Sequence, residues 1–335
     1  MQLAKDEAHE LPLAAKVIQE NCYIDDFLTG GNTEHEVIET YKQLSEILKR
    51  RGFRIHKFCS NSKTVRNIIP SELQEALFNF EEADINCVIK TLGLIWNPND
   101  DYVALNVSPI DGVSNPPPTK RSVLSAIGHI FDPLGYIGPV ITTAKLLMQD
   151  LWRLKLKLDD ELPIEQLKLW TTFREQFPSI NELRKQRCVI SNKAATIELH
   201  GYSDASKRAY GEVLCTKSIF PDGTVDVQLV CSKSRVAPLK LVTIPRLKLC
   251  ETMLLARLVE KTTAAMKIPF STVTLHTDSQ VCLSWFKKSP LALNQFVANR
   301  VATIHELTQD YNWCYVRSQE NPTAGAQNRL RLLLL

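Results

Sequence analysis

The sequence lacks the features of several protein classes. It has no apolar run of about 18 residues, and its first residues show no basic region followed by an apolar stretch, so we expect neither a membrane span nor a signal peptide. Only 12 of 335 residues are glycine and 17 are proline, which excludes collagen-like and low-complexity chains. The nine cysteines are dispersed and form no Cys-x-x-Cys pair. We therefore expect free thiols in a reducing, intracellular compartment, cytoplasmic or nuclear.

The composition is that of a soluble globular chain with room for two or three domains. Hydrophobic residues make up 44% and charged residues 23% of the sequence. The net charge is only +3, but the charges are unevenly distributed. Residues 1–110 contain 11 basic and 17 acidic residues, whereas residues 191–335 contain 18 basic and 11 acidic ones. A basic C-terminal segment is typical of phosphate binding.

Three segments differ in their predicted secondary structure. Residues 1–110 combine short strands and helices, including a helix over 33–51 that Gly52 ends. Residues 111–190 are predicted to be mostly helical, and their prolines at 116–118 favour an extended linker. In residues 191–335 the spacing of hydrophobic residues changes, and the pattern predicts the element order β-β-β-α-β-α-α-β. We take the three segments as three predicted domains.

Three acids of the last segment stand at unusual places. Asp204 and Asp278 end predicted strands, and Glu251 lies on a predicted helix among leucines at helical spacing. A buried carboxylate needs a compensating cation, and carboxylate oxygens are the ligands that Mg²⁺ prefers. Two such ions could clamp a phosphoryl displacement. For each acid alone, a turn cap or a solvated side chain is the alternative.

These residues carry a resemblance to a known family. The segments 201–206 (Gly-Tyr-Ser-Asp-Ala-Ser), 249–251 (Leu-Cys-Glu) and 276–279 (His-Thr-Asp-Ser) resemble the RNase H domain of Bel/Pao-type LTR retrotransposon Pol polyproteins, a region catalogued as "Pao retrotransposon peptidase". The resemblance implies cleavage of the RNA strand of an RNA–DNA hybrid, with Asp204, Glu251 and Asp278 as ligands of Mg²⁺ or Mn²⁺. The family has a fourth acid where this chain has Ala324.

A second motif lies near the start of the chain. Residues 23–26 read Tyr-Ile-Asp-Asp between apolar residues, as at the tip of a β-hairpin. They resemble the reverse-transcriptase palm signature, which implies that Tyr23 belongs to this signature, that Asp25 and Asp26 bind metal, and that Lys57 is the lysine of the next palm motif. Residues 91–96 resemble its Leu-Gly primer-grip hairpin. The palm requires a further Asp on an earlier strand that this chain does not contain, so we expect no DNA synthesis from it.

The middle segment completes the resemblance. Residues 119–135 are similar to the Bel/Pao connection region, so the resemblance covers roughly residues 10–323. It implies an α+β and α/β multidomain protein with a partial reverse-transcriptase palm, a helical thumb or connection, and an RNase H-like mixed sheet with helices.

A run of basic residues precedes the predicted Glu251 helix without an intervening acid. It consists of Lys233, Arg235, Lys240, Arg246 and Lys248. Such a run is commonly solvated surface, but here it is placed to contact the phosphates of a hybrid. The expected partners are therefore an RNA–DNA hybrid or another nucleic acid, together with other Pol segments, and no membrane.

Two functions stay open at this point. The first is two-metal hydrolysis of RNA in a hybrid, and the second is nucleic-acid binding by a non-catalytic remnant, which Ala324 and the missing palm Asp favour. An aspartic peptidase is not expected, because Asp278-Ser279-Gln280 lacks the glycine of Asp-Thr/Ser-Gly. An integrase is not expected either, because its acids run Asp, Asp, Glu.

Overall fold

The computed structural model describes residues 2–75, 89–91, 93–107 and 117–323. The chain forms two compact units: residues 1–90 with 95–103, and residues 91–94 with 104–335. The middle and the last of the three predicted domains fall within the second unit, and the three-domain division stays a prediction.

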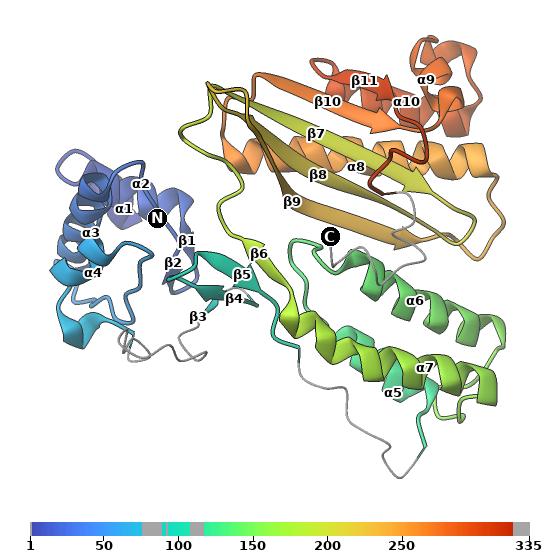
Figure 1. Ribbon diagram of the computed structural model, residues 1–335, viewed down its shortest axis with the longest axis horizontal. Coiled ribbons are helices and arrows are strands. Elements are labelled where there is room, and N and C mark those ends of the chain that lie inside the picture. The colour runs from blue at the N-terminus through green and yellow to red at the C-terminus, as the bar shows by residue number, and fades with distance from the viewer. Residues whose placement is uncertain (1, 76–88, 92, 108–116, 324–335) are drawn as a thin grey trace. The chain divides into compact units, whose positions relative to one another are not determined.

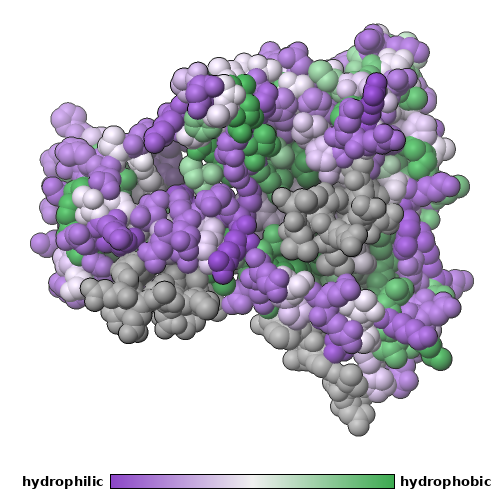
Figure 2. All heavy atoms as spheres, viewed as in Figure 1, coloured by the Kyte–Doolittle hydropathy of each residue, from purple (hydrophilic) through white to green (hydrophobic). Residues whose placement is uncertain are grey.

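Helices dominate the N-terminal unit. They are α1 (Gln2–Asp6), α2 (Pro12–Glu20), α3 (Glu34–Lys49) and α4 (Lys63–Ile68), followed by the 3-10 turn η1 (Ser71–Leu73). Helix α3 begins after Thr33, whose side chain accepts a hydrogen bond from the Glu36 N–H, and Gly52 follows its end with φ +80°. The buried face of α3 packs against α2. Figure 2 shows that hydrophilic residues predominate on the visible surface of these helices. The predicted helix over 33–51 is confirmed.

The Tyr-x-Asp-Asp motif forms a hairpin, as its sequence predicts. Strands β1 (Cys22–Tyr23) and β2 (Asp26–Phe27) pair antiparallel, with Tyr23 opposite Asp26. Ile24 at the turn has φ 56°, in the left-handed region that a two-residue hairpin turn requires. Four further short strands are β3 (Ile89–Thr91), β4 (Leu94–Asn97), β5 (Tyr102–Ala104) and β6 (Arg184–Gln186).

The middle segment is helical, as predicted. Its elements are α5 (Lys120–Gly128), α6 (Gly138–Arg153), α7 (Ile164–Gln176) and the 3-10 helix η2 (Phe177–Glu182). Helix α5 begins with a capping box, in which the Thr119 and Ser122 side chains each accept a hydrogen bond from the other residue's N–H. The three helices enclose one apolar core around the stacked rings of Trp170 and Phe173, whose centroids lie 5.6 Å apart.

A five-stranded mixed sheet organises the C-terminal segment (Figure 1). Its strands are β7 (Thr196–Ala205), β8 (Ala209–Ile219), β9 (Val225–Val236), β10 (Thr272–Thr277) and β11 (Asn312–Tyr315). They lie in the order β11-β10-β7-β8-β9, in which β7, β8 and β9 pair antiparallel while β10 runs parallel to both β7 and β11. The helical elements are α8 (Ile244–Met266), α9 (Gln280–Phe286), η3 (Pro290–Ala292) and α10 (Gln295–Thr308), which confirms the predicted element order.

Helix α8 lies across one face of this sheet (Figure 1). Alternate residues of β7 are buried on that side, which is the period-two pattern of a strand with one covered face. A Cβ on Gly201 would come within 2.8 Å of Leu275 and 2.9 Å of Leu255, so only glycine lets the side chains around β7 pack this closely. The helix is therefore held close to the central strand.

Helix α6 packs against the opposite face of β9. Cys231 Sγ lies 3.6 Å from Thr262 of α8, whereas the next residue, Ser232, donates a hydrogen bond from its hydroxyl to the Gly135 carbonyl just before α6. Successive strand residues point to opposite faces, so α6 and α8 cover different sides of the sheet. The predicted fold class of mixed α and β with a mixed sheet and helices is confirmed. Among the described residues, no helix has the length and apolarity to cross a membrane.

Candidate functional site

Two aspartates lie side by side at the ends of neighbouring parallel strands. In the register of β7 and β10, Ser203 pairs with Thr277, so the following residues, Asp204 and Asp278, occupy equivalent positions. Only 18% of the Asp204 side chain and 7% of the Asp278 side chain are exposed. The parallel pairing therefore brings together two of the three acids that the sequence singles out.

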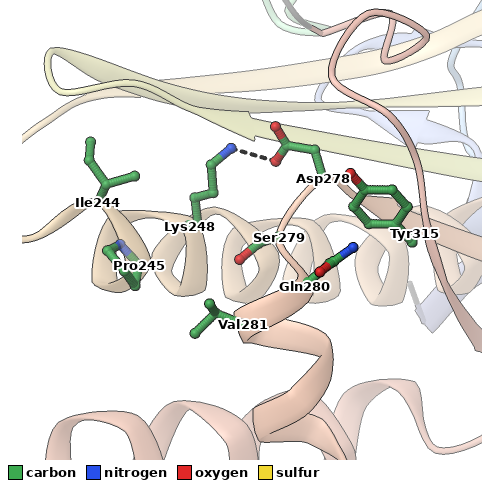
Figure 3. Close-up of a pocket in the computed structure, with 8 residues that line it drawn as sticks. All are labelled: Ile244, Pro245, Lys248, Asp278, Ser279, Gln280, Val281 and Tyr315. Carbon is green, nitrogen blue, oxygen red and sulfur yellow. Dashed lines mark hydrogen bonds and ion pairs between the residues drawn. The ribbon is translucent and has the colours of Figure 1, made fainter.

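The ammonium group of Lys248 contacts both carboxylates, and Figure 3 shows its contact with Asp278. Lys248 extends from α8, and its Nζ donates to Asp204 Oδ1 at 3.1 Å and also to Asp278 Oδ1. Burial opposes the charged form of Lys248, but the charges of the neighbouring acids outweigh it and raise the lysine's pKa. The other oxygen of Asp278, Oδ2, accepts a hydrogen bond of 2.6 Å from the Ser318 hydroxyl. We call Lys248, Asp204 and Asp278 the ion triad.

Glu251, the third predicted ligand, is buried beneath the triad. Its exposure is 0%, and its Oε1 accepts hydrogen bonds of 3.4 Å from the hydroxyls of Ser203 and Thr277. Its Oε2 has no hydrogen-bond partner among the described residues. Burial is the largest cause that raises the pKa of Glu251 well above its usual value. Glu251 is therefore a buried carboxyl group that lies under the two aspartates and makes no hydrogen bond with the Lys248 ammonium among the described residues.

The residues present do not fit a divalent metal ion. Mg²⁺ binds through carboxylate oxygens with room for water, whereas here the Lys248 ammonium contacts one oxygen of each aspartate and the third acid, Glu251, is fully buried. No group of three or more His, Cys, Asp or Glu side chains placed to hold a metal occurs within the part of the chain that the structure describes.

An open pocket of about 390 Å³ lies beside the triad. Its lining residues come from the start of α8, the start of α9 and the end of β11, and they are Ile244, Pro245, Lys248, Asp278, Ser279, Gln280, Val281 and Tyr315 (Figure 3). Tyr315 is 48% exposed, which leaves an aromatic side chain at the pocket.

The predicted basic run divides into two groups. Lys233 and Arg235 on β9, Lys240 in the following loop and Arg246 at the start of α8 are exposed. The side chain of Lys248 is only 15% exposed and is held by the two aspartates. Four of the five cations are thus available to an anionic partner. The fifth, which the sequence suggests as a phosphate contact, belongs to the triad in this structure.

Sequence reasoning missed a second buried acid. Glu212 on β8 is 1% exposed, and neither of its carboxylate oxygens has a hydrogen-bond partner among the described residues. Burial raises the pKa of Glu212 well above its usual value, although Lys233 and Arg235 act in the opposite direction. The signal was present in the sequence as a lone acid at a core-facing position of an alternating strand.

The palm-like residues belong to the N-terminal unit, and the triad belongs to the other unit. Asp25 and Asp26 are exposed, Tyr23 is 58% exposed, and Lys57 is exposed with φ 58°. Among the described residues, the two aspartate side chains make no hydrogen bond or ion pair. Within the part of the chain that the structure describes, the hairpin therefore leaves both carboxylates exposed.

Residues 321–323, which read Asn-Pro-Thr, precede Ala324 and contact β7. Asn321 is 3% exposed and donates a hydrogen bond of 2.8 Å to the Ser203 carbonyl. Thr323 donates its hydroxyl to the Asn321 side chain. This segment is therefore anchored beside β7, and Ala324 lies outside the described residues.

Similar solved structures include RNase H domains of low sequence identity. The N-terminal RNase H domain of a Mycobacterium tuberculosis protein is 11% identical with a TM-score of 0.28, over 39% of this chain and 89% of that chain. RNase H1 from Halobacterium salinarum is 12% identical with a TM-score of 0.24, over 39% of this chain and 97% of that chain. No curated protein matches this chain.

A foamy viral protein matches over a longer stretch. The foamy viral protease-reverse transcriptase, solved in complex with double-stranded DNA, is 13% identical with a TM-score of 0.45, over 94% of this chain and 48% of that chain. The present chain thus spans about half the length of that protein.

One family model matches part of the sequence. Residues 119–279 match the model of the Pao retrotransposon-like RNaseH-like domain, a range that includes the helices α5 to α7 as well as the triad. The resemblance to Bel/Pao-type retrotransposon Pol is thereby confirmed over residues 119–279, which are similar to the Pao retrotransposon-like RNaseH-like domain.

Proposed function

We propose that this chain is a retrotransposon Pol fragment whose RNase H-like unit binds RNA–DNA hybrid, or a closely related nucleic acid, without cutting it. The observation that carries the proposal is the arrangement of charge around the triad. Two carboxylates that would repel a phosphate backbone are neutralised in part by Lys248, while four exposed cations remain on β9, the following loop and the start of α8.

Two of the exposed cations, Lys233 and Arg246, are related to the triad by a shared cavity and by a shared helix. Lys233 and Asp204 line one small cavity between β7, β8, β9 and α6. Arg246 precedes Lys248 by two residues on α8, and its guanidinium group lies 5.1 Å from the centre of the Phe296 ring. A hybrid that lies along this end of the sheet would place phosphates near these side chains. Other Pol segments are further expected partners.

Fluorescence anisotropy with a labelled RNA–DNA hybrid tests this binding. We expect Lys233→Ala and Arg246→Ala each to weaken binding several-fold and to lower the slope of log affinity against log salt by about 1. Lys261→Ala is the matched control, because Lys261 is an exposed cation on the same helix as Arg246. Hybrid binding that is absent, or that the two variants leave unchanged, would contradict the proposal.

Cleavage of the RNA strand is the second candidate function. Its support is the adjacent placement of Asp204 and Asp278 at two parallel strand ends. A labelled hybrid incubated with the chain in Mg²⁺ or Mn²⁺ separates the two functions. We expect intact RNA, and cutting that Asp204→Asn abolishes would replace the binding-only proposal with an enzymatic one.

A further inference from the structure

The ion triad places a fixed positive charge between two half-buried carboxylates. Lys248 Nζ contacts an oxygen of Asp204 and an oxygen of Asp278, and all three side chains are at most 18% exposed. Two ionised carboxylates at this degree of burial repel each other unless a cation lies between them. The side chain of Lys248 supplies that cation from within the chain.

The geometry of α8 explains why residue 248 reaches the acids while residue 251 does not. Lys248 and Glu251 are three residues apart on the helix, so they project from the same side at heights that differ by about 4.5 Å. The Lys248 side chain ends between Asp204 and Asp278, whereas Glu251 ends at the hydroxyls of Ser203 and Thr277. Position 248 is therefore the position on α8 that faces the acid pair.

We infer that the Lys248 ammonium takes the place of a metal ion in this site, so that the native chain binds no divalent metal between Asp204 and Asp278. A carboxylate at position 248 would then convert the triad into a site for a divalent cation. The ammonium occupies the oxygens that a metal would need, and its charge repels a second cation. A glutamate in its place would add a third carboxylate to the pair, with the ligand chemistry that Mn²⁺ and Mg²⁺ accept. This inference does not depend on hybrid binding.

Titration of the full chain with Mn²⁺, followed by the electron paramagnetic resonance signal of free Mn²⁺, tests the inference directly. We expect Lys248→Glu to bind one Mn²⁺ at least about tenfold more tightly than the native chain. Adding Asp278→Asn to that variant should remove the gain. Lys261→Glu is the control for the charge change, because it lies on the same helix about 20 Å along the axis from Lys248.

Each outcome decides the matter. Binding that is tight in Lys248→Glu and weak in both the native chain and Lys261→Glu supports the inference. A folded Lys248→Glu variant that binds no better than Lys261→Glu would overturn it. Mn²⁺ binding by the native chain that the substitution Asp278→Asn abolishes would also overturn the inference. If Lys248→Glu does not fold, Lys248→Met replaces it in the titration. We expect Lys248→Met to bind Mn²⁺ more tightly than the native chain does, and equal binding would overturn the inference.

If neither variant folds, the Mn²⁺ titration of the native chain is the test. The inference requires that Asp278→Asn leave the Mn²⁺ binding of that chain unchanged. Hybrid binding, measured by anisotropy on the same native sample in EDTA, reports on the proposed function separately. A native chain that binds hybrid but also binds Mn²⁺ through Asp278 would overturn only the inference. A native chain that binds neither the hybrid nor Mn²⁺ would contradict only the proposed function.

Discussion

The two acidic motifs of this chain have opposite surroundings. Asp25 and Asp26 lie at the exposed tip of a hairpin of two-residue strands. Asp204 and Asp278 end long, register-paired strands and are fixed by Lys248. A motif of two aspartates is therefore not a site by itself. The difference comes from the scaffold, because among the described residues the second pair lies on a five-stranded sheet and is contacted by a side chain from the covering helix α8.

The largest expected effect is the loss of the cation from the triad. Lys248→Ala should lower the free energy of unfolding by about 3 kcal/mol at neutral pH, because it leaves two half-buried carboxylates facing each other. Chemical denaturation measures this change. Lys261→Ala, exposed on the same helix, should stay within about 0.5 kcal/mol of the native chain. A similar small change for both variants would mean that the triad contributes little to stability.

A backbone position in the second unit provides the next prediction. Gly135 has φ +76°, and a Cβ there would lie 2.0 Å from the Ser232 carbonyl oxygen, so Gly135→Ala should destabilise the chain by about 1–3 kcal/mol. Gly30 in the N-terminal unit has nothing within 4 Å of such a Cβ, and Gly30→Ala should be neutral within about 0.5 kcal/mol. Denaturation of both variants makes the comparison. Equal effects would contradict the close contact between the start of α6 and β9.

The buried Glu212 predicts a dependence of stability on pH. A carboxyl group whose pKa is raised in the folded state contributes its full stability below about pH 4, and that contribution is lost as pH rises through the folded-state value. Glu212→Gln removes this loss. The variant should match the native chain near pH 4 and exceed its free energy of unfolding by about 1–3 kcal/mol at pH 8. Glu260→Gln, exposed on α8, should show no such trend. A constant difference across this range would contradict the account of Glu212.

The smallest expected effect lies in the N-terminal motif. Asp25→Asn and Asp26→Asn should change the free energy of unfolding by less than about 0.5 kcal/mol, because both side chains are exposed. Asp278→Asn, made for comparison, should cost clearly more, because it takes a charged partner from Lys248. If the N-terminal variants were as costly as Asp278→Asn, the contrast between the two motifs would not hold.

Much of the fold was predictable from local signals. Strands β7 to β9 follow from alternating side chains between turn residues, and α3 from its Thr33 cap and apolar face. The meeting of Asp204 and Asp278 followed from two strands ending at an acid. The role of Lys248 was not predictable, because a lysine three residues before Glu251 suits a phosphate contact as well as an internal ion pair. Only the docking of α8 on the sheet distinguishes the two.

The central claim is that a lysine ammonium, rather than a metal ion, neutralises Asp204 and Asp278. A crystal structure of the native chain grown with millimolar Mn²⁺, with anomalous data collected near the manganese edge, tests it most directly. The account predicts no anomalous peak between the two carboxylates and Lys248 Nζ within hydrogen-bond distance of both. A manganese ion bound by Asp204 and Asp278, with the Lys248 side chain turned away, would contradict it.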